Sequence, residues 1–429
     1  MLIKRDFYLN KLIKSIRNKR IKVLTGIRRV GKSFLLNELY YSYLLENGVS
    51  PEQIIKIPLD NISNIKYRNP ILLAEYINSK ISDNLENYIF IDEIQFVETI
   101  KNPYIENNYI GFYEVLNEFL NKNNVDVYVT GSNSRMLSKD VLTEFRGRGD
   151  QIHVMPLSIY ELKLFSDKSF ESLYQDYQIY GGLPYALSLL EDIEKEKYLK
   201  DLFKETYLID VIDRNKVRSV DKLDKLTNIL ASSIGSFTNI SKIENTFKSE
   251  LKVTYDKDTI SNHISHLKDA FIISEANRFD IKGRKYIGAN SKYYYTDIGV
   301  RNAILNFRQY EPTHIMENII YNQLIMLGFS VDVGIVVINE KVKDKYIKKQ
   351  LEVDFVVNKG NLKYYIQSAY LMETKEKSVQ EKKSLLNIDD SFKKIIIIND
   401  NIKAHYDENG ILLVSLKEFL LDLNVLNKY

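Results

Sequence analysis

Residues 26–33 read Gly-Ile-Arg-Arg-Val-Gly-Lys-Ser, a spacing that suits the binding of nucleotide phosphates. The glycines let the backbone wrap tightly, so that amide N–H groups point inward at phosphate oxygens. Lys32 can reach the β- and γ-phosphates, and the hydroxyl of Ser33 is suited to ligate Mg²⁺. ATP and Mg²⁺ are therefore the predicted ligands. The residues predicted to bind the nucleotide are Gly26, Ile27, Arg28, Arg29, Val30, Gly31, Lys32, Ser33 and Phe34.

The segments on either side of this loop favour the same interpretation. An apolar strand is predicted over 21–25, and apolar residues at helical spacing follow from Ser33. A helix that begins near Lys32 would direct the positive end of its dipole at the bound anion. A glycine-containing turn that matches the pattern by chance is the weaker alternative.

Two acidic residues, Asp92 and Glu93, follow the apolar run 88–91. This pattern indicates a buried parallel strand with carboxylates at its C-terminal end, where ligands bind in open α/β sheets. Asp92 would hold Mg²⁺ through water, and Glu93 would act as the general base for the attacking water. Solvated acids at a strand end are the alternative, but the phosphate loop upstream favours the catalytic interpretation.

Polar residues also follow a third apolar strand, predicted over 125–130. Asn133, or Ser132 beside it, is a candidate to orient the lytic water against the γ-phosphate, and a polar turn is the alternative. Arg146 and Arg148, flanked by glycines, suit charge stabilisation of a transferring phosphoryl group, in cis or from a neighbouring subunit. A solvated basic turn explains these arginines equally well.

The composition excludes several other kinds of site. The chain has 429 residues, enough for two to four domains, with 45% hydrophobic and 27% charged residues and a net charge of +3. With no cysteine, disulfides, thiolate catalysis and Cys-ligated zinc are excluded, and the five histidines show no metal-ligand spacing. There is no signal peptide or apolar run of transmembrane length. We expect a cytoplasmic protein that does not enter a membrane.

The predicted elements place these residues on one sheet. Strands over 21–25, 54–60, 88–91 and 125–130 alternate with helices over 6–16, 33–45 and 70–84. Such alternation is typical of an α/β fold with a parallel sheet. Residues 157–217 are mostly helical by periodicity and fit a lid over the nucleotide.

Several motifs together resemble the AAA-type ATP-binding proteins of prokaryotes, which are related to the archaeal-type ATPases and, more distantly, to the signal-transducing NTPases. The motifs are Thr25-Gly-Ile-Arg-Arg-Val-Gly-Lys-Ser33, Ile91-Asp-Glu-Ile-Gln95, Thr130-Gly-Ser-Asn-Ser134, Phe145-Arg-Gly-Arg148, Met155-Pro-Leu-Ser158, Glu161-Leu162 and Tyr180-Gly-Gly-Leu-Pro184. The resemblance runs essentially from end to end. It implies an AAA+ ATPase core over 1–155, a helical lid over 156–217, a winged helix over 218–305 and a restriction-endonuclease-like α/β domain over 306–429.

The resemblance also carries expectations about individual residues and assembly. It implies that the Gly-Gly-x-Pro element lies near the nucleotide, so that Pro184 packs against adenine; from the sequence alone this element is only a turn signal. AAA+ relatives often form rings, so a homo-oligomer is open, as is a monomer or dimer.

The region 218–305 has the order expected of a winged helix. Helical patterns over 222–234, 240–246 and 258–271 precede a small hairpin. Ser, Asn and His side chains of 259–267 could meet a DNA groove, and nearby basic residues could meet phosphates. Those basic residues are Arg278, Lys282, Arg284 and Lys285. A spacer or a protein-docking module is an equal alternative.

In the last region, Glu317 lies on a predicted helix, and Asp354 and Gln367 lie on predicted strands. Restriction-type nucleases gather Mg²⁺ and a lysine with a helix Glu, a strand Asp and an acid-x-Lys element. Here Gln367 takes the position of that acid and Ala369 that of the lysine, so no side chain can donate to a developing phosphorane. We expect a nuclease-like fold that has lost its full catalytic set and retains DNA or protein binding.

Three functions follow from these patterns. The first is an ATPase that couples ATP binding and hydrolysis to a DNA or protein partner through the C-terminal modules. The second is an ATP-dependent binding switch with little hydrolysis, and the third is an ATP-gated nuclease. The missing lysine argues against the third.

Overall fold

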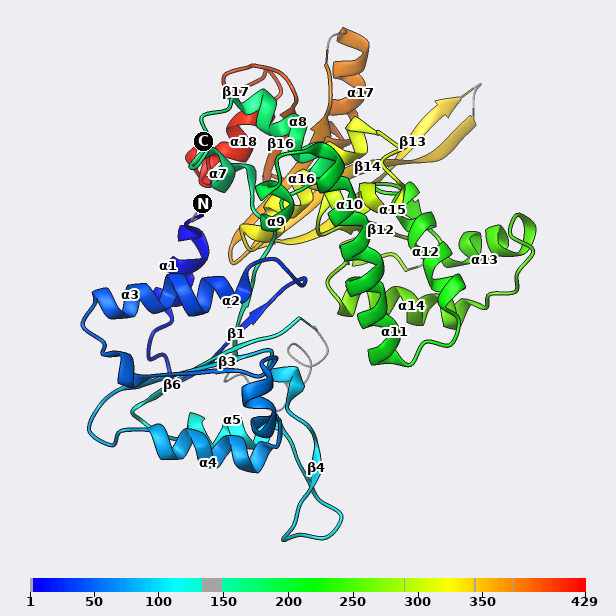
Figure 1. Cartoon of the computed structure of the whole chain (residues 1–429). Helices are drawn as coiled ribbons and strands as arrows, with labels where there is room; N and C mark the ends of the chain where they lie inside the picture. The colour runs from blue at the N-terminus through cyan, green and yellow to red at the C-terminus, as the bar shows by residue number, and fades with distance from the viewer. Residues whose placement is uncertain (1–2, 133–148, 289, 343–344, 373) are drawn as a thin grey trace. The chain divides into compact units, whose positions relative to one another are not determined.

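The computed structural model divides into two compact units (Figure 1). The first comprises the chain up to Met155 together with Asp269–Phe271, and the second comprises Pro156–Lys268 and Ile272–Tyr429. No helix among the described residues is both long and apolar enough to cross a lipid bilayer. The structure describes residues 3–132, 149–288, 290–342, 345–372 and 374–429.

The first unit is built on a parallel sheet in which the described residues supply five strands, in the order β2-β3-β6-β1-β7. Strands β1 and β3 are buried along their whole length, because helices cover both faces of the sheet (Figure 1). The strands are β1 (Ile21–Thr25), β2 (Ile54–Pro58), β3 (Asn87–Asp92), β6 (Val125–Thr130) and β7 (Gly149–His153). The predicted α/β fold with a parallel sheet is thus present in this unit.

The helices of the first unit follow the predicted order. A continuous helix begins at Lys32 directly after the phosphate loop and runs to Glu46, with a π-helical segment in its middle. The helix predicted over 70–84 ends at Lys80, because the side chain of Asn87 pairs with both backbone groups of Ser82 and draws this segment out of the helix. The elements are α1 (Asp6–Lys14), α2 (Lys32–Phe34), η1 (Leu35–Tyr40), α3 (Tyr41–Glu46), η2 (Pro51–Gln53), η3 (Ile62–Arg68), α4 (Pro70–Lys80), η4 (Ile94–Phe96), the β4–β5 hairpin (Ile100–Lys101, Tyr109–Ile110) and α5 (Phe112–Leu120).

The second unit begins with helices, as the periodicity predicts. They are α7 (Ile159–Lys163), α8 (Phe170–Tyr180), α9 (Pro184–Ser188), α10 (Asp192–Asp201), η6 (Leu202–Leu208) and α11 (Ile209–Asn215). Two later helices are α15 (Ile298–Ile304) and α16 (Pro312–Met326). Helix α15 packs against α8, where Asn302 donates to the carbonyls of Gln178 and Ile179 at 2.8 and 2.9 Å.

Between α11 and α15, the described residues form three helices and a small antiparallel sheet with the strand order β8-β12-β9. The elements are α12 (Val220–Ser232), β8 (Phe237–Thr238), α13 (Ile240–Ser249), α14 (Lys257–Asp269), β9 (Ile273–Ala276) and β12 (Ser291–Tyr295). On α14, Ser261 and Asn262 are exposed, but His263 is buried against the hydroxyl of Tyr255. The expectation that the histidines of this helix could meet a DNA groove is therefore wrong for His263, because its imidazole is buried in the core.

A mixed sheet forms the rest of the second unit; its eight strands among the described residues follow the order β11-β10-β13-β14-β15-β16-β18-β17. The first two strands come from the β9–β12 connection, and β10 pairs with β13 in parallel. Buried apolar side chains of β13, β14, β15 and β16 contribute to its core. The elements are β10 (Arg278–Asp280), β11 (Lys285–Tyr286), β13 (Ser330–Val342), β14 (Lys345–Lys359), β15 (Leu362–Ala369), α17 (Lys375–Leu386), β16 (Lys393–Ile398), β17 (His405–Tyr406), β18 (Leu412–Ser415), α18 (Leu416–Leu421) and α19 (Val425–Lys428).

Candidate nucleotide site

The phosphate loop joins β1 to α2, and its glycines have different tasks. Gly26 has a φ of +139°, and a Cβ there would overlap the carbonyl oxygen of Val154, so only glycine fits. Gly31 has a φ of +93°, and a Cβ there would meet no atom within 4 Å. The loop is thus closely packed on the sheet at Gly26 and open at Gly31, an arrangement that leaves room for a ligand beside the start of the helix.

Lys32 lies against the backbone of the loop. Its Nζ donates to the carbonyl oxygens of Gly26 at 3.0 Å and Ile27 at 3.1 Å, and the side chain is only 4% exposed. Neutral carbonyls are weaker partners for an ammonium group than phosphate oxygens are. The residues present therefore fit a bound nucleotide phosphate, which would offer Lys32 a stronger acceptor.

Asp92 is the centre of the hydrogen bonds between the strand ends. Its Oδ1 accepts from Ser33 Oγ at 3.0 Å and from the hydroxyl of Thr130. Burial raises the pKa of Asp92, and the two hydroxyl donors partly offset this rise. Because Ser33 lies in the first turn of the helix and Thr130 ends β6, three segments far apart in sequence meet at this carboxylate.

Glu93 directly follows Asp92 and is held by its backbone as well as its side chain. It adopts a left-handed conformation with φ +54°, and its N–H donates to Thr130 Oγ1 at 2.9 Å. Its Oε2 accepts from the amide of Gln95, which also lies 3.4 Å from Ser132 Oγ. The Oε1 of Gln95 is buried and has no hydrogen-bond partner among the described residues. A ligand that carries a hydrogen-bond donor could therefore bind to the Oε1 of Gln95.

The remaining predicted residues are placed as follows. In the loop, Ile27 and Val30 are buried, and Arg28 Nε lies 3.4 Å from Ser132 Oγ. Pro184 is the first residue of α9 in the second unit, and its contact with adenine stays a prediction. Three further candidates, Asn133, Arg146 and Arg148, lie outside the described residues.

Arg5 was not predicted to be part of the site, yet it donates a hydrogen bond to the backbone of the phosphate loop. Its guanidinium is buried and donates to the carbonyl oxygens of Val30 at 3.0 Å and Met155 at 2.8 Å. The backbone N–H of Met155 in turn donates to the hydroxyl of Tyr8 at 2.9 Å. The segment entering α1 thereby fixes the loop and the segment after β7, although nothing in the local pattern of residues 5–8 indicates this.

His153, at the end of β7, lies beside the strand that leads into the loop. Its Nδ1 is 3.2 Å from the hydroxyl of Thr25. Burial, with the positive charges of Lys32 and Lys11, lowers the pKa of His153 to about 4. The imidazole is therefore neutral at physiological pH and adds no charge to the site.

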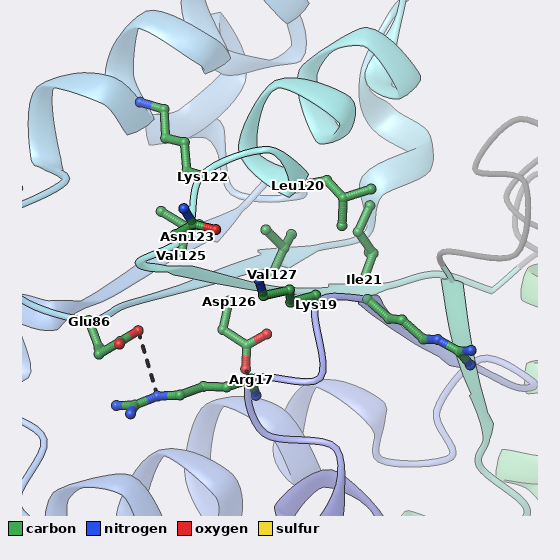
Figure 2. Close-up of a pocket in the computed structure, with 11 residues that line it drawn as sticks. Arg17, Lys19, Ile21, Glu86, Leu120, Lys122, Asn123, Val125, Asp126 and Val127 are labelled. Atoms are coloured by element: carbon green, nitrogen blue, oxygen red, sulfur yellow. Dashed lines mark hydrogen bonds and ion pairs between the residues drawn. The ribbon is translucent and has the colours of Figure 1, made fainter.

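The opposite, N-terminal ends of the strands carry a separate cavity of about 180 Å³ (Figure 2). At this cavity Arg17 Nε lies 3.6 Å from Glu86. Asp126, which also lines it, pairs with the buried Lys22. The hydroxyl of Tyr128 also donates to Asp126 at 2.7 Å. This edge of the sheet therefore offers paired charges, whereas the edge with Asp92 offers donors and acceptors to a ligand.

A second group of acids lies in the second unit, and we call Glu317, Glu352 and Asp354 the carboxylate cluster. Lys292 of β12 lies among them: its Nζ is 2.8 Å from Glu317 Oε1 and 2.5 Å from Glu352 Oε1. The hydroxyl of Tyr294 donates to the same oxygen of Glu317 at 2.6 Å. Glu317 and Asp354 are thus brought together as predicted from the nuclease-like pattern, whereas Lys292, Tyr294 and Glu352 were missed.

The strands explain how Asp354 reaches this cluster. The pairing of β13 with β14 shifts, since Asp332 pairs with Val356 and Gly334 with Val353, so Asp354 lies in a β-bulge. Asp354 Oδ2 accepts from the backbone N–H of Ser368 at 2.8 Å, and Gln367 Oε1 lies 3.4 Å from the N–H of Asp354. Burial and then the charge of Glu317 raise the pKa of Asp354 well above its ordinary value.

The Gly-Gly-x-Pro element has a packing role within the second unit. Gly181 has a φ of +70°, and a Cβ at Gly182 would overlap the carbonyl oxygen of Leu157. The carboxylate of Asp297 accepts from the N–H groups of Gly182 at 2.8 Å and Val300 at 3.1 Å, so it joins this element to the start of α15. Burial raises the pKa of Asp297 to about 6.

Comparison with known proteins gives matches along most of the chain. Residues 18–163 match a family model described as an AAA domain, and residues 171–311 match a model described as a domain of unknown function. An uncharacterised protein of Haemophilus influenzae is 31% identical over 429 residues, which is 98% of this chain and 99% of that protein. An uncharacterised protein of Methanocaldococcus jannaschii is 30% identical over 411 residues, 90% of this chain and 84% of that protein.

Two solved structures are also similar in part. The first is the Aeropyrum pernix Orc1 protein in complex with DNA, which is 14% identical with a TM-score of 0.28; the match covers 71% of this chain and 92% of that one. The second is Cdc6p from Pyrobaculum aerophilum, which is 13% identical with a TM-score of 0.30; the match covers 74% of this chain and 96% of that one. At TM-scores this low the likeness establishes neither fold nor function. The match over 18–163 confirms the predicted AAA-type core, and the winged helix and the nuclease-like domain stay predictions.

Proposed function

The chain belongs to one family with its relatives in H. influenzae and M. jannaschii, and its residues 18–163 match an AAA domain; we propose that it is an ATPase whose phosphate loop binds ATP with Mg²⁺. The observation that carries the proposal is the meeting of Ser33, Asp92 and Thr130 at the C-terminal ends of the strands, beside Lys32. Among the described residues, the side chains that donate hydrogen bonds to Asp92 are neutral hydroxyls, so its charge remains available to a cation.

Each side chain has a role in this proposal. Ser33 and Asp92 would hold Mg²⁺, which when bound neutralises charge on the β- and γ-phosphate oxygens. Lys32 exchanges its carbonyl partners for phosphate oxygens and stabilises the transferring phosphoryl group. Glu93 takes a proton from the attacking water, and the amide of Gln95 holds the carboxylate in place until then.

The experiment is steady-state ATP turnover by the wild type and by Glu93→Gln, with Glu98→Gln as the control. Glu98 is exposed and five residues further along the chain. We expect turnover that requires Mg²⁺, and a loss of about 100-fold or more in Glu93→Gln while ATP still binds. Absence of turnover by the wild type, with or without DNA, would leave the switch without hydrolysis as the better description.

We propose further that residues 218–305 form a winged helix that meets the partner. The chain order α12, β8, α13, α14, β9, β12 and the small antiparallel sheet support this arrangement. Two of the basic residues expected to meet phosphates are already engaged, since Arg278 donates to Gln350 and Lys282 lies 3.3 Å from Asp389. The exposed Ser261 and Asn262 of α14 are therefore the better candidates for contact with DNA.

This part of the proposal is tested by adding duplex DNA to the turnover assay. If DNA is the partner, it stimulates turnover of the wild type, and Asn262→Glu loses the stimulation while basal turnover stays the same. Lack of any response to DNA, together with lack of binding in a mobility-shift assay, would favour a protein partner.

A further inference from the structure

The carboxylate cluster lies where the nuclease-like pattern would place a divalent metal. Its helix acid, Glu317, and its strand acid, Asp354, are both buried, and carboxylates so placed are the usual ligands of Mg²⁺ or Mn²⁺. The question is whether the side chains around these acids leave a place for such an ion.

Lys292 takes that place. Its ammonium is 2.8 Å from Glu317 and 2.5 Å from Glu352, and the side chain is only 3% exposed. Lys292 lies on β12, Glu317 on α16 and Glu352 on β14, so the ammonium joins three separate elements of the unit. An ion bound between the same oxygens would have to displace this buried ammonium.

Two carboxylate oxygens of the cluster also accept hydrogen bonds from other groups. Glu317 Oε1 accepts from Tyr294 as well as from Lys292, and Asp354 Oδ2 accepts from the N–H of Ser368. In the part of the chain that the structure describes, no group of three or more carboxylate, histidine or cysteine side chains is arranged to hold a metal ion. The residues present therefore do not fit the metal that the nuclease-like pattern implies.

We propose that Lys292 is the resident cation of the carboxylate cluster: its ammonium stands where a nuclease would hold its metal, and the cluster binds no divalent ion. Lys292 therefore does not take over the catalytic role of the lysine whose position Ala369 occupies. Lys292 serves instead to join β12 to α16 and β14, which ties the proposed winged helix to the sheet of the C-terminal region.

The test measures Mn²⁺ binding in the absence of nucleotide. Binding is detected as a loss of the electron paramagnetic resonance signal of the free ion. We compare the wild type with Lys292→Gln, which removes the ammonium and leaves the acids. We expect Lys292→Gln to gain one Mn²⁺ site at least about tenfold tighter than any site in the wild type, and Asp354→Asn in the same chain to remove it. Mn²⁺ should also raise the melting temperature of Lys292→Gln. It should leave the melting temperature of the wild type unchanged, because the cluster of the wild type binds no ion.

Lys349→Gln is the matched control, because Lys349 lies on β14 in a half-exposed pair with Glu340 at 3.0 Å. It should gain no site. A folded Lys292→Gln that gains no Mn²⁺ would overturn the proposal. So would a wild-type Mn²⁺ site that Asp354→Asn removes, and this comparison stands even if Lys292→Gln does not fold.

Discussion

Asp92 in the first unit and Glu317 in the second are both buried acids that meet side chains from distant segments, but their partners differ. Asp92 accepts hydrogen bonds from two neutral hydroxyls, those of Ser33 and Thr130. Glu317 accepts from an ammonium and a phenol, those of Lys292 and Tyr294. A hydroxyl leaves the carboxylate charge uncompensated, whereas an ammonium neutralises it within the protein.

The difference teaches that the partner of a buried acid decides what the acid can do. The uncompensated charge of Asp92 suits a cation that arrives with a nucleotide. The compensated charge of Glu317 suits a permanent link between elements, which holds only as long as both partners remain. Each prediction below changes a buried acid or one of its partners, or the lysine of the phosphate loop, and asks whether ligand binding, stability or turnover changes.

The largest expected effect on a ligand is on nucleotide binding. Lys32→Ala should weaken ATP–Mg²⁺ binding by about 100-fold or more, because a buried ammonium that meets phosphate oxygens is lost. Isothermal titration with ATP or a slowly hydrolysed analogue measures this. Lys122→Ala, at the opposite strand ends, is the control and should bind as the wild type does; unchanged affinity in Lys32→Ala would refute the phosphate-loop assignment.

The corresponding change in the second unit should affect stability instead. Lys292→Gln, in the presence of EDTA, should lower the free energy of unfolding by about 3–5 kcal/mol, because a buried carboxylate loses its cation. Lys349→Gln removes a partner of a half-exposed pair and should cost about 1 kcal/mol or less. Urea denaturation followed by circular dichroism compares the two; equal losses would mean that the Lys292 pair is no more than a surface pair.

Asp297 is an intermediate case, a buried acid that accepts hydrogen bonds from the backbone N–H groups of Gly182 and Val300. Its folded pKa of about 6 lies above the ordinary value of 3.8, so the folded state binds the proton more tightly and loses stability as the pH rises through this window. Asp297→Asn does not titrate, so its stability relative to the wild type should rise by about 2.4 kcal/mol between pH 4 and pH 7.

Measurements at the acid end of this range serve as the internal reference, because the hydrogen bond that asparagine loses costs the same at every pH. Denaturation curves for both proteins at several pH values give the difference. A difference that stays constant across the range would mean that Asp297 does not carry a raised pKa.

The smallest expected effect concerns the hydroxyl partner of Asp92. Thr130→Val removes a donor to Asp92 and an acceptor for the N–H of Glu93. ATP turnover should fall about tenfold, because both acids are less well held while the charges of the site remain. Thr99→Val, an exposed position in the same unit, should keep the wild-type rate. A fall as large as that of Glu93→Gln would assign Thr130 a direct part in the reaction.

Local patterns were sufficient to predict the phosphate loop and the strand ends around it. Residues 26–33 follow β1 and open the helix that begins at Lys32, as expected, and Asp92 ends β3. The role of Thr130 as a hydrogen-bond partner of Asp92 was not predicted, although Thr130 ends β6, the strand beside β3. The pairing of Ile91 with Val129 brings Thr130 alongside Asp92, and a sequence does not specify this register.

The second unit was harder to predict for the same reason. The acids Glu317 and Asp354 could be named from their elements, but Lys292 lies on a strand of another predicted domain and matches no motif. The β-bulge at Asp354 and the pairing of β10 with β13 likewise depend on segments that meet only in the folded chain.

The sequence by itself determined where a phosphate can bind, because that chemistry depends on consecutive N–H groups, glycine conformations and one lysine within eight residues. Only the tertiary structure decided which acids keep their charge available and which are neutralised from within. Electrostatic interactions in a protein depend on distance and burial, and both are set by side chains that folding brings from remote parts of the chain.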